Sequence, residues 1–121
     1  MSNILAVIRD AIDTATTLPV HMGRIYDDPG EHISITHEMF AGSKDSCEIT
    51  TTMPLTIQIA TRKGGDGIGE AEDIMDALLH KKHVGDDYTA IDVRFNSRSS
   101  IQDPDTYWRT ILTITCYLRR N

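Results

Sequence analysis

Residues 54–95, PLTIQIATRKGGDGIGEAEDIMDALLHKKHVGDDYTAIDVRF, carry the strongest pattern in this 121-residue chain. Apolar and polar residues alternate over residues 55–60, which is the period of a half-buried β-strand. A helix is predicted next, because apolar residues recur at spacings of three and four: Ala71, Ile74, Met75, Leu78 and Leu79. Alternation over residues 91–95 predicts a second strand. Each element has one apolar face, so the three must pack together.

The glycine-rich connector, residues 62–67, is predicted to be a flexible polar loop. It lies where phosphate-binding loops occur, but Glu70 stands where the dinucleotide fingerprint needs glycine and the P-loop needs lysine. Acidic residues around the helix start would also repel a phosphate. We expect Gly67 to cap the helix, with Glu70 completing a capping box, and Gly85 to adopt the left-handed conformation after it.

The flanking sequence predicts another helix and further strands. Ile4, Ile8 and Ile12 mark a helix that begins at Ser2 or Asn3 and ends before Pro19. Strands are expected at about residues 20–26, 32–40, 49–60, 88–96 and 106–119. Between them we expect a mobile arm or hairpin at about residues 41–52 and a polar loop over residues 96–104.

The order α-β-β-β-α-β-β predicts one domain, residues 1–121, of the α+β class. We expect a mostly antiparallel β-sheet with two helices packed on one face. The other face would be rich in Thr, Gln, Ser and Arg, and would either be solvated or meet another subunit.

The composition, 40% hydrophobic and 25% charged, is typical of a soluble globular domain. No apolar run approaches the roughly 20 residues of a membrane span, and charged residues at 9, 10 and 13 interrupt the N-terminal segment, so we expect a protein that is cytosolic at synthesis and makes no membrane contact. A net charge of −6 without a basic stripe predicts that DNA slides past without being bound.

The sequence contains few candidates for chemistry. His80 and His83 are three residues apart on the predicted helix, and Asp76 lies one turn earlier, so these side chains are weak candidates for a divalent metal site. No second cluster with ligand spacing is present, and no catalytic motif is found. We therefore expect no catalytic residue, no metal and no other cofactor. Cys116 is predicted to be buried in a strand, and Cys47 to be a free thiol in a loop.

The order and spacing of several segments resemble the tail completion proteins of long-tailed bacteriophages, the tail terminator or head–tail joining family. An N-terminal helix ends in Leu18-Pro19-Val20-His21, and Gly23-Arg24-Ile25-Tyr26-Asp27-Asp28 leads to His32-Ile33-Ser34-Ile35. Leu55-Thr56-Ile57-Gln58-Ile59-Ala60-Thr61-Arg62 then precedes the helix at residues 71–80. The end, Asp103-Pro104-Asp105-Thr106-Tyr107-Trp108-Arg109 running into Thr113-Ile114-Thr115, is also similar.

This resemblance implies a non-enzymatic virion component at the head–tail junction, assembled in the host cytoplasm. Proteins of this family form a ring, usually of six subunits, on the tail tube. The ring stops polymerisation of the tube protein and presents a surface to the head connector or neck protein, while DNA passes through its lumen. Partners would thus be further copies of the chain, the tail tube protein and the connector. The alternatives are a head–tail adaptor, a tail tube subunit, or a small ligand- or metal-binding domain.

Contacts with neighbouring subunits or the tail are expected at the arm of residues 41–52 and the loop of residues 96–104, because both are long and polar. Tyr107 and Arg109 are added because Tyr, Trp and Arg dominate protein interfaces, with the alternative that Trp108 is core and Tyr107 a surface strand residue. The candidate interface residues are Lys44, Asp45, Cys47, Glu48, Arg98, Asp103, Tyr107 and Arg109.

Overall fold

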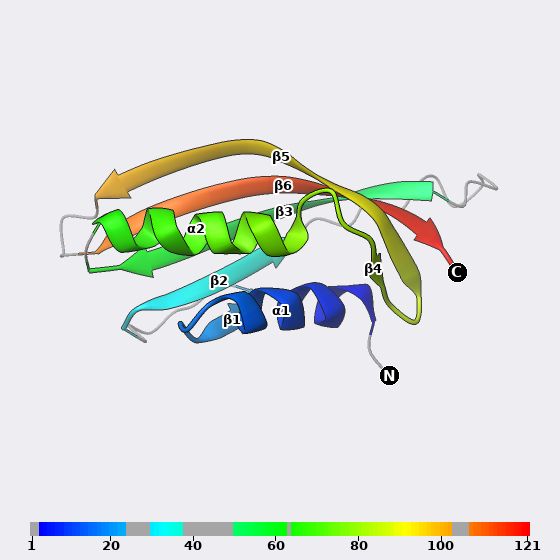
Figure 1. The fold of residues 1–121 in the computed structure, drawn as a ribbon, viewed down its shortest axis with the longest axis horizontal. Helices are drawn as coiled ribbons and strands as arrows, with labels where there is room; N and C mark the ends of the chain where they lie inside the picture. The colour runs from blue at the N-terminus through cyan, green and yellow to red at the C-terminus, as the bar shows by residue number, and fades with distance from the viewer. Residues whose placement is uncertain (1–2, 24–29, 38–49, 63, 103–106) are drawn as a thin grey trace.

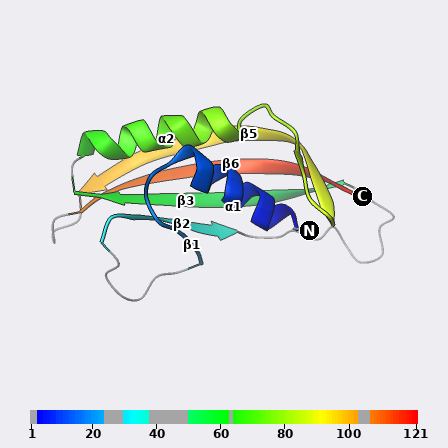
Figure 2. The ribbon, with the colours of Figure 1, turned by 60° about the horizontal axis from the view of Figure 1, so that its bottom comes forward.

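The computed structural model describes residues 3–23, 30–37, 50–62, 64–102 and 107–121. The helices are α1 (Ile4–Ala15) and α2 (Gly64–Leu78), and the strands are β1 (Val20–Met22), β2 (His32–His37), β3 (Thr50–Thr61), β4 (His83–Val84), β5 (Tyr88–Gln102) and β6 (Trp108–Arg120). The described strands form one sheet in the order β1-β2-β3-β6-β5-β4, and among them only β1 and β2 are parallel. Both helices lie on one face of this curled sheet (Figures 1 and 2). The predicted α+β class and its antiparallel sheet are confirmed.

Helix α1 follows its sequence signals closely. Asn3 is the N-cap, and its side-chain oxygen accepts a hydrogen bond from the backbone N–H of Ala6. Ile4, Ile8 and Ile12 are buried on the side that faces the sheet. None of the helices in the described part of the chain is both long enough and apolar enough to span a membrane.

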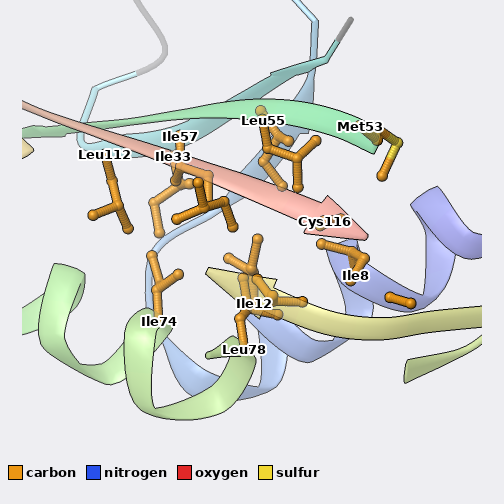
Figure 3. Close-up of a cluster of buried hydrophobic side chains, with 14 of the residues drawn as sticks. Ile8, Ile12, Ile33, Met53, Leu55, Ile57, Ile74, Leu78, Leu112 and Cys116 are labelled. Carbon is orange, nitrogen blue, oxygen red and sulfur yellow. The ribbon is translucent and has the colours of Figure 1, made fainter. Parts of the chain in front are cut away.

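The core lies between the sheet and the helix layer. In Figure 3, Leu55 and Ile57 of β3 and Leu112 and Cys116 of β6 point toward side chains from both helices. Fully burying one side chain such as Ile57 contributes about 1.5–3 kcal/mol. Burial raises the pKa of the Cys116 thiol to about 12. The predicted alternation in these two strands and the burial of Cys116 are confirmed.

The start of α2 differs from the prediction of a flexible glycine-rich loop. The helix begins at Gly64, so most of that segment is its first turn. Gly67 is buried, and a Cβ atom on it would collide with the Thr110 hydroxyl and lie 3.3 Å from the hydroxyl of Thr61. The glycine therefore lets the helix approach β3 and β6 closely, a tertiary requirement that local sequence signals do not contain.

The end of α2 also differs. The helix ends at Leu78, and His80, with φ at 58°, takes the left-handed conformation that was expected of Gly85. Gly85 is instead buried in the turn after β4, where an added Cβ would lie 2.6 Å from the backbone nitrogen of Ile4. The expectation for Gly85 is wrong because that glycine is needed for close packing against α1.

Strand β5 is much longer than predicted. The expected polar loop at residues 96–104 is strand up to Gln102. Register irregularities fall between Ala90 and Asp92 and between Phe95 and Ser97. The first irregularity makes Ile91 an extra residue, so Ala90 and Val93 are buried while Ile91 is 46% exposed, against the predicted common face of residues 91, 93 and 95. Phe95 does share the face of Val93, since it pairs with the buried Ile114, yet it is also 46% exposed.

The remaining strands agree in position with the sequence predictions, with shorter bounds. β2 covers the described part of the strand expected at residues 32–40, and β1 covers residues 20–22 of the strand expected at 20–26, ending before Gly23. Residues 50–52 of the expected arm belong to β3, where they pair with the C-terminal end of β6, and residues 41–49 lie outside the described residues. The extra short strand β4 was not predicted, because two residues are too few to give a periodicity.

Candidate assembly surface

Along most of its length, one side of β5 pairs with no strand among the described residues. β5 pairs with β6 from Tyr88 to Gln102, but on its other side β4 reaches only Thr89 and Ala90. The backbone N–H of His80 then donates a hydrogen bond to the Val93 carbonyl at 3.0 Å. Beyond Val93, no strand in the described part of the chain pairs with this side. We call residues 94–102 the free β5 edge; it lies along the top of the sheet in Figure 1.

The free β5 edge is exposed on both faces as well as along its edge. All of residues 94–102 are exposed, including Phe95 and Ile101, the latter at 55%. Unpaired N–H and C=O groups along such a strand are a template for the addition of another strand. Nearby bulges and arginines moderate this tendency, because they are common means of discouraging unspecific pairing at edges. We therefore expect the free β5 edge to accept one specific partner strand and to discourage unspecific pairing.

The structure brings three of the candidate interface residues to the β5–β6 hairpin. Arg98 lies on the free β5 edge, paired across the ladder with Leu112. Arg109 is half-buried near the start of β6 and pairs with Ile101. Tyr107 is half-buried, and the Arg62 guanidinium carbon lies 6.0 Å from its ring centroid. The other candidates, Lys44, Asp45, Cys47, Glu48 and Asp103, lie outside the described residues.

A polar cluster that the sequence did not predict lies where the free β5 edge begins. The Arg94 Nε donates to Asp92 Oδ2 at 2.8 Å, and the Arg94 guanidinium carbon is 5.8 Å from the centroid of Tyr117. His80 Nδ1 lies 3.8 Å from Asp92 Oδ1. The hydrogen bond from Arg94 is the main reason that the pKa of Asp92 is lowered. The sequence signal for this pair was the spacing of Asp92 and Arg94 by two residues, because side chains two residues apart in a strand lie on the same face.

The weak metal candidates are not on one helix face. His80 follows the end of α2 and its side chain is 75% exposed, whereas His83 belongs to β4 with Nε2 3.2 Å from the Leu78 carbonyl oxygen. Asp76 is exposed on α2. Among the described residues, no group of three His, Cys, Asp or Glu side chains is arranged to hold a metal ion. The predicted helical face of His80 and His83 is wrong because the helix ends too early.

Comparison with known proteins shows similarity of fold. No known family model matches the chain, and no curated protein matches it. A chain from the virion of the native gene transfer agent particle is similar over 96% of this chain and 97% of that chain, with a TM-score of 0.73 and 12% sequence identity. A second solved chain, which carries no functional description, is similar over 96% of this chain and 93% of its own, with a TM-score of 0.61 and 14% identity. At such identities the similarity shows a shared fold.

Proposed function

We propose that this chain is a non-enzymatic structural protein of a phage-like virion that assembles as a ring at the head–tail junction. The observation that carries this proposal is the similarity of fold to a chain of a gene transfer agent virion, because it spans nearly the whole of both chains. The resemblance of the sequence segments to tail completion proteins supports the same conclusion.

The free β5 edge is suited to the ring contact. A closed ring needs a heterologous contact, in which one surface of a subunit meets a different surface of the next. An exposed strand edge provides main-chain hydrogen bonds for such a contact, and alternate side chains provide specificity. Phe95 and Ile101 add apolar area that is exposed in the single chain. The part of the predicted arm outside β3, residues 41–49, stays in the proposal as a second contact with neighbours or with the tail.

In this proposal the ring has six subunits and binds the last ring of the tail tube. It stops polymerisation of the tube protein, offers the attachment surface to the head connector or neck protein, and leaves a lumen through which DNA passes. The protein is then located in the virion, at the head end of the tail.

The decisive experiment is electron microscopy of particles produced without this chain. Tails that are overlong or lack heads, beside filled heads without tails, are the expected result. Normal tails joined to normal heads would contradict the proposal. Tails of normal length that fail to join filled heads would favour the head–tail adaptor over the terminator.

A second experiment separates the terminator from a tail tube subunit. Purified chain is added to polymerising tail tube protein and the tubes are measured by negative-stain microscopy. A terminator shortens the tubes as its concentration rises and forms no long tubes alone. If the chain by itself forms long tubes, it is a tube subunit.

A further inference from the structure

One face of the sheet lies opposite the helix layer (Figure 2). Its side chains are mostly polar. We call it the outer face. Strand pairing places its central side chains next to one another, with Thr56 beside Thr113 and Gln58 beside Ile111. Their neighbours in β2, Ser34 and Thr36, extend the same polar surface. All of these side chains are half-buried, so each of them keeps part of its surface available for contact.

Charge is divided between the two layers of the molecule. The helices carry Asp10, Asp13, Glu70, Glu72, Asp73 and Asp76, opposed by Arg9. Strands β5 and β6 carry Arg94, Arg98, Arg109, Arg119 and Arg120, opposed by Asp92. Asp92 is already bound to Arg94. The net negative charge of the chain therefore conceals a surplus of positive charge on the β5–β6 hairpin.

Three of these arginines lie on the outer face. Leu118 and Thr110 point into the core, so their neighbours Arg119 and Arg109 point outward. Arg94 pairs with Thr115, which has the same parity as these two arginines in β6. At about 3.4 Å per residue, the backbone positions of Arg109, Arg94 and Arg119 are spaced by about 20 Å and about 14 Å along the hairpin. We call these residues the outer arginine row. The sequence showed no basic stripe because strand pairing, not chain order, aligns them.

The residues around the outer arginine row fit phosphate groups better than a protein surface. Most protein–DNA hydrogen bonds to phosphate come from arginine and lysine together with Ser, Thr, Asn, Gln and Tyr side chains. The core of a protein–protein interface is also enriched in arginine and tyrosine, but in addition it is enriched in tryptophan, phenylalanine and methionine and depleted of serine. The outer face offers threonine, glutamine and serine, with Tyr117 at one side.

We infer that the outer face is turned toward double-stranded DNA and makes weak, sequence-independent contacts with its phosphates through the outer arginine row. This inference rests on the proposed function, since it names the surface that lines the path of the DNA. Because the charge of Arg94 is offset by Asp92, we count about two neutralised phosphates, at Arg109 and Arg119, which gives a salt-dependence slope of about −1.8. So few contacts bind one copy weakly, which suits a polymer that must move past, while several copies in a ring act together.

The first test maps contacts on the full-length chain by NMR. A ¹⁵N-labelled sample is titrated with a short duplex of mixed sequence at about 50 mM salt and again at about 200 mM, where phosphate contacts weaken. Amide signals of Arg94, Arg109, Arg119 and their outward-facing neighbours are expected to shift at the lower salt and to return at the higher. Absence of any shift, or shifts centred on α1 and α2, would overturn the inference.

The second test compares variants of equal charge. In the double variant Arg109→Gln, Arg119→Gln, the affinity for the duplex at low salt is expected to fall about tenfold. The slope of log affinity against log salt concentration should become less negative by about 1.8. The control, Arg9→Gln with Lys82→Gln, removes the same charge elsewhere and should change affinity less than about twofold. The single Arg119→Gln variant, at an exposed site, serves if the double variant does not fold. Equal losses in both chains would show an effect of net charge alone and refute the inference.

One further outcome concerns a different partner. If the outer-row variant changes the self-association of the chain and leaves DNA binding intact, the outer face contacts a second copy and the inference is wrong. These measurements on purified protein are independent of particle assembly. Normal particles in the absence of the chain would contradict the proposed function even if the NMR map places DNA on the outer face.

Discussion

Asp87, in the turn between β4 and β5, caps the first residue of α1. Its Oδ1 accepts a hydrogen bond from the Ile4 backbone N–H at 2.9 Å and another from the Tyr88 N–H at 2.8 Å. Asn121 holds the same turn, because its side-chain amide donates to the Gly85 carbonyl and its side-chain oxygen accepts from the Thr89 hydroxyl. This turn is therefore hydrogen-bonded both to the start of α1 and to Asn121, the last described residue.

Replacing Asp87 with alanine is expected to lower the free energy of unfolding by about 1 kcal/mol, because both backbone donors lose their acceptor. Asp86→Ala is the matched control, since Asp86 is an exposed neighbour in the same turn. Urea unfolding of both variants measures the difference. Equal stability of the two variants would mean that the Asp87 cap contributes nothing.

Gly67 and Gly69 offer a comparison within one helix. Gly67→Ala is expected to destabilise the protein by about 1–3 kcal/mol, because the added methyl group meets Thr110 and Thr61 across a close helix–sheet contact. At Gly69 nothing lies within 4 Å of an added Cβ, so Gly69→Ala should stabilise the helix by about 0.5–1 kcal/mol. Thermal or urea unfolding gives both values, and effects of the same sign would contradict the close contact at Gly67.

Ile101→Lys adds a charge to the free β5 edge and is expected to reduce ring formation on tails at least about tenfold, since edge charges oppose strand addition. Val84→Lys is the control, because Val84 is 61% exposed in β4, away from residues 94–102. Both variants should keep their stability within about 0.5 kcal/mol, as is usual for exposed sites. Particle yield and tail length report assembly. Undiminished assembly of Ile101→Lys would remove the free β5 edge from the ring contact.

The buried Cys116 predicts a loss of stability at alkaline pH. Its pKa is raised from 9.0 to about 12, so the folded protein holds the thiol proton where the unfolded chain has lost it. This contribution is fully present below pH 9 and declines toward pH 12, by up to about 1.4 kcal/mol per pH unit. The free energy of unfolding is measured at several pH values for the protein and for Cys116→Ala. The difference between the two profiles separates the contribution of Cys116 from those of other titrating groups. Parallel pH profiles of the two proteins would contradict the prediction.

The fold was predictable in those helices and strands whose buried residues recur at a regular spacing in the sequence. The alternation in β3 and β6 and the isoleucine spacing of α1 predicted their buried residues, because each packs one continuous face on the core. Prediction failed where geometry depends on distant contacts. Position 67 of the helix requires glycine because Thr110 is close, and the bulge after Ala90 in β5 moves Ile91 out of the expected face.

The candidate surfaces were less predictable than the core. Arg98 was selected for lying in a polar loop, and the structure instead places it on a strand edge. The outer arginine row was missed because Arg94, Arg109 and Arg119 are far apart in sequence and share a face only through strand register. Surface charge patterns of this kind depend on pairing, which composition and periodicity do not report.

The position of β6 in the sheet has a consequence for synthesis. β6 is synthesised after the other described strands, yet it lies between β3 and β5 and joins the two halves of the sheet. Until it is available, strands β1–β3 and strands β4–β5 have no hydrogen-bonded connection to each other. The complete six-stranded sheet of a nascent chain therefore forms only after β6 has been translated.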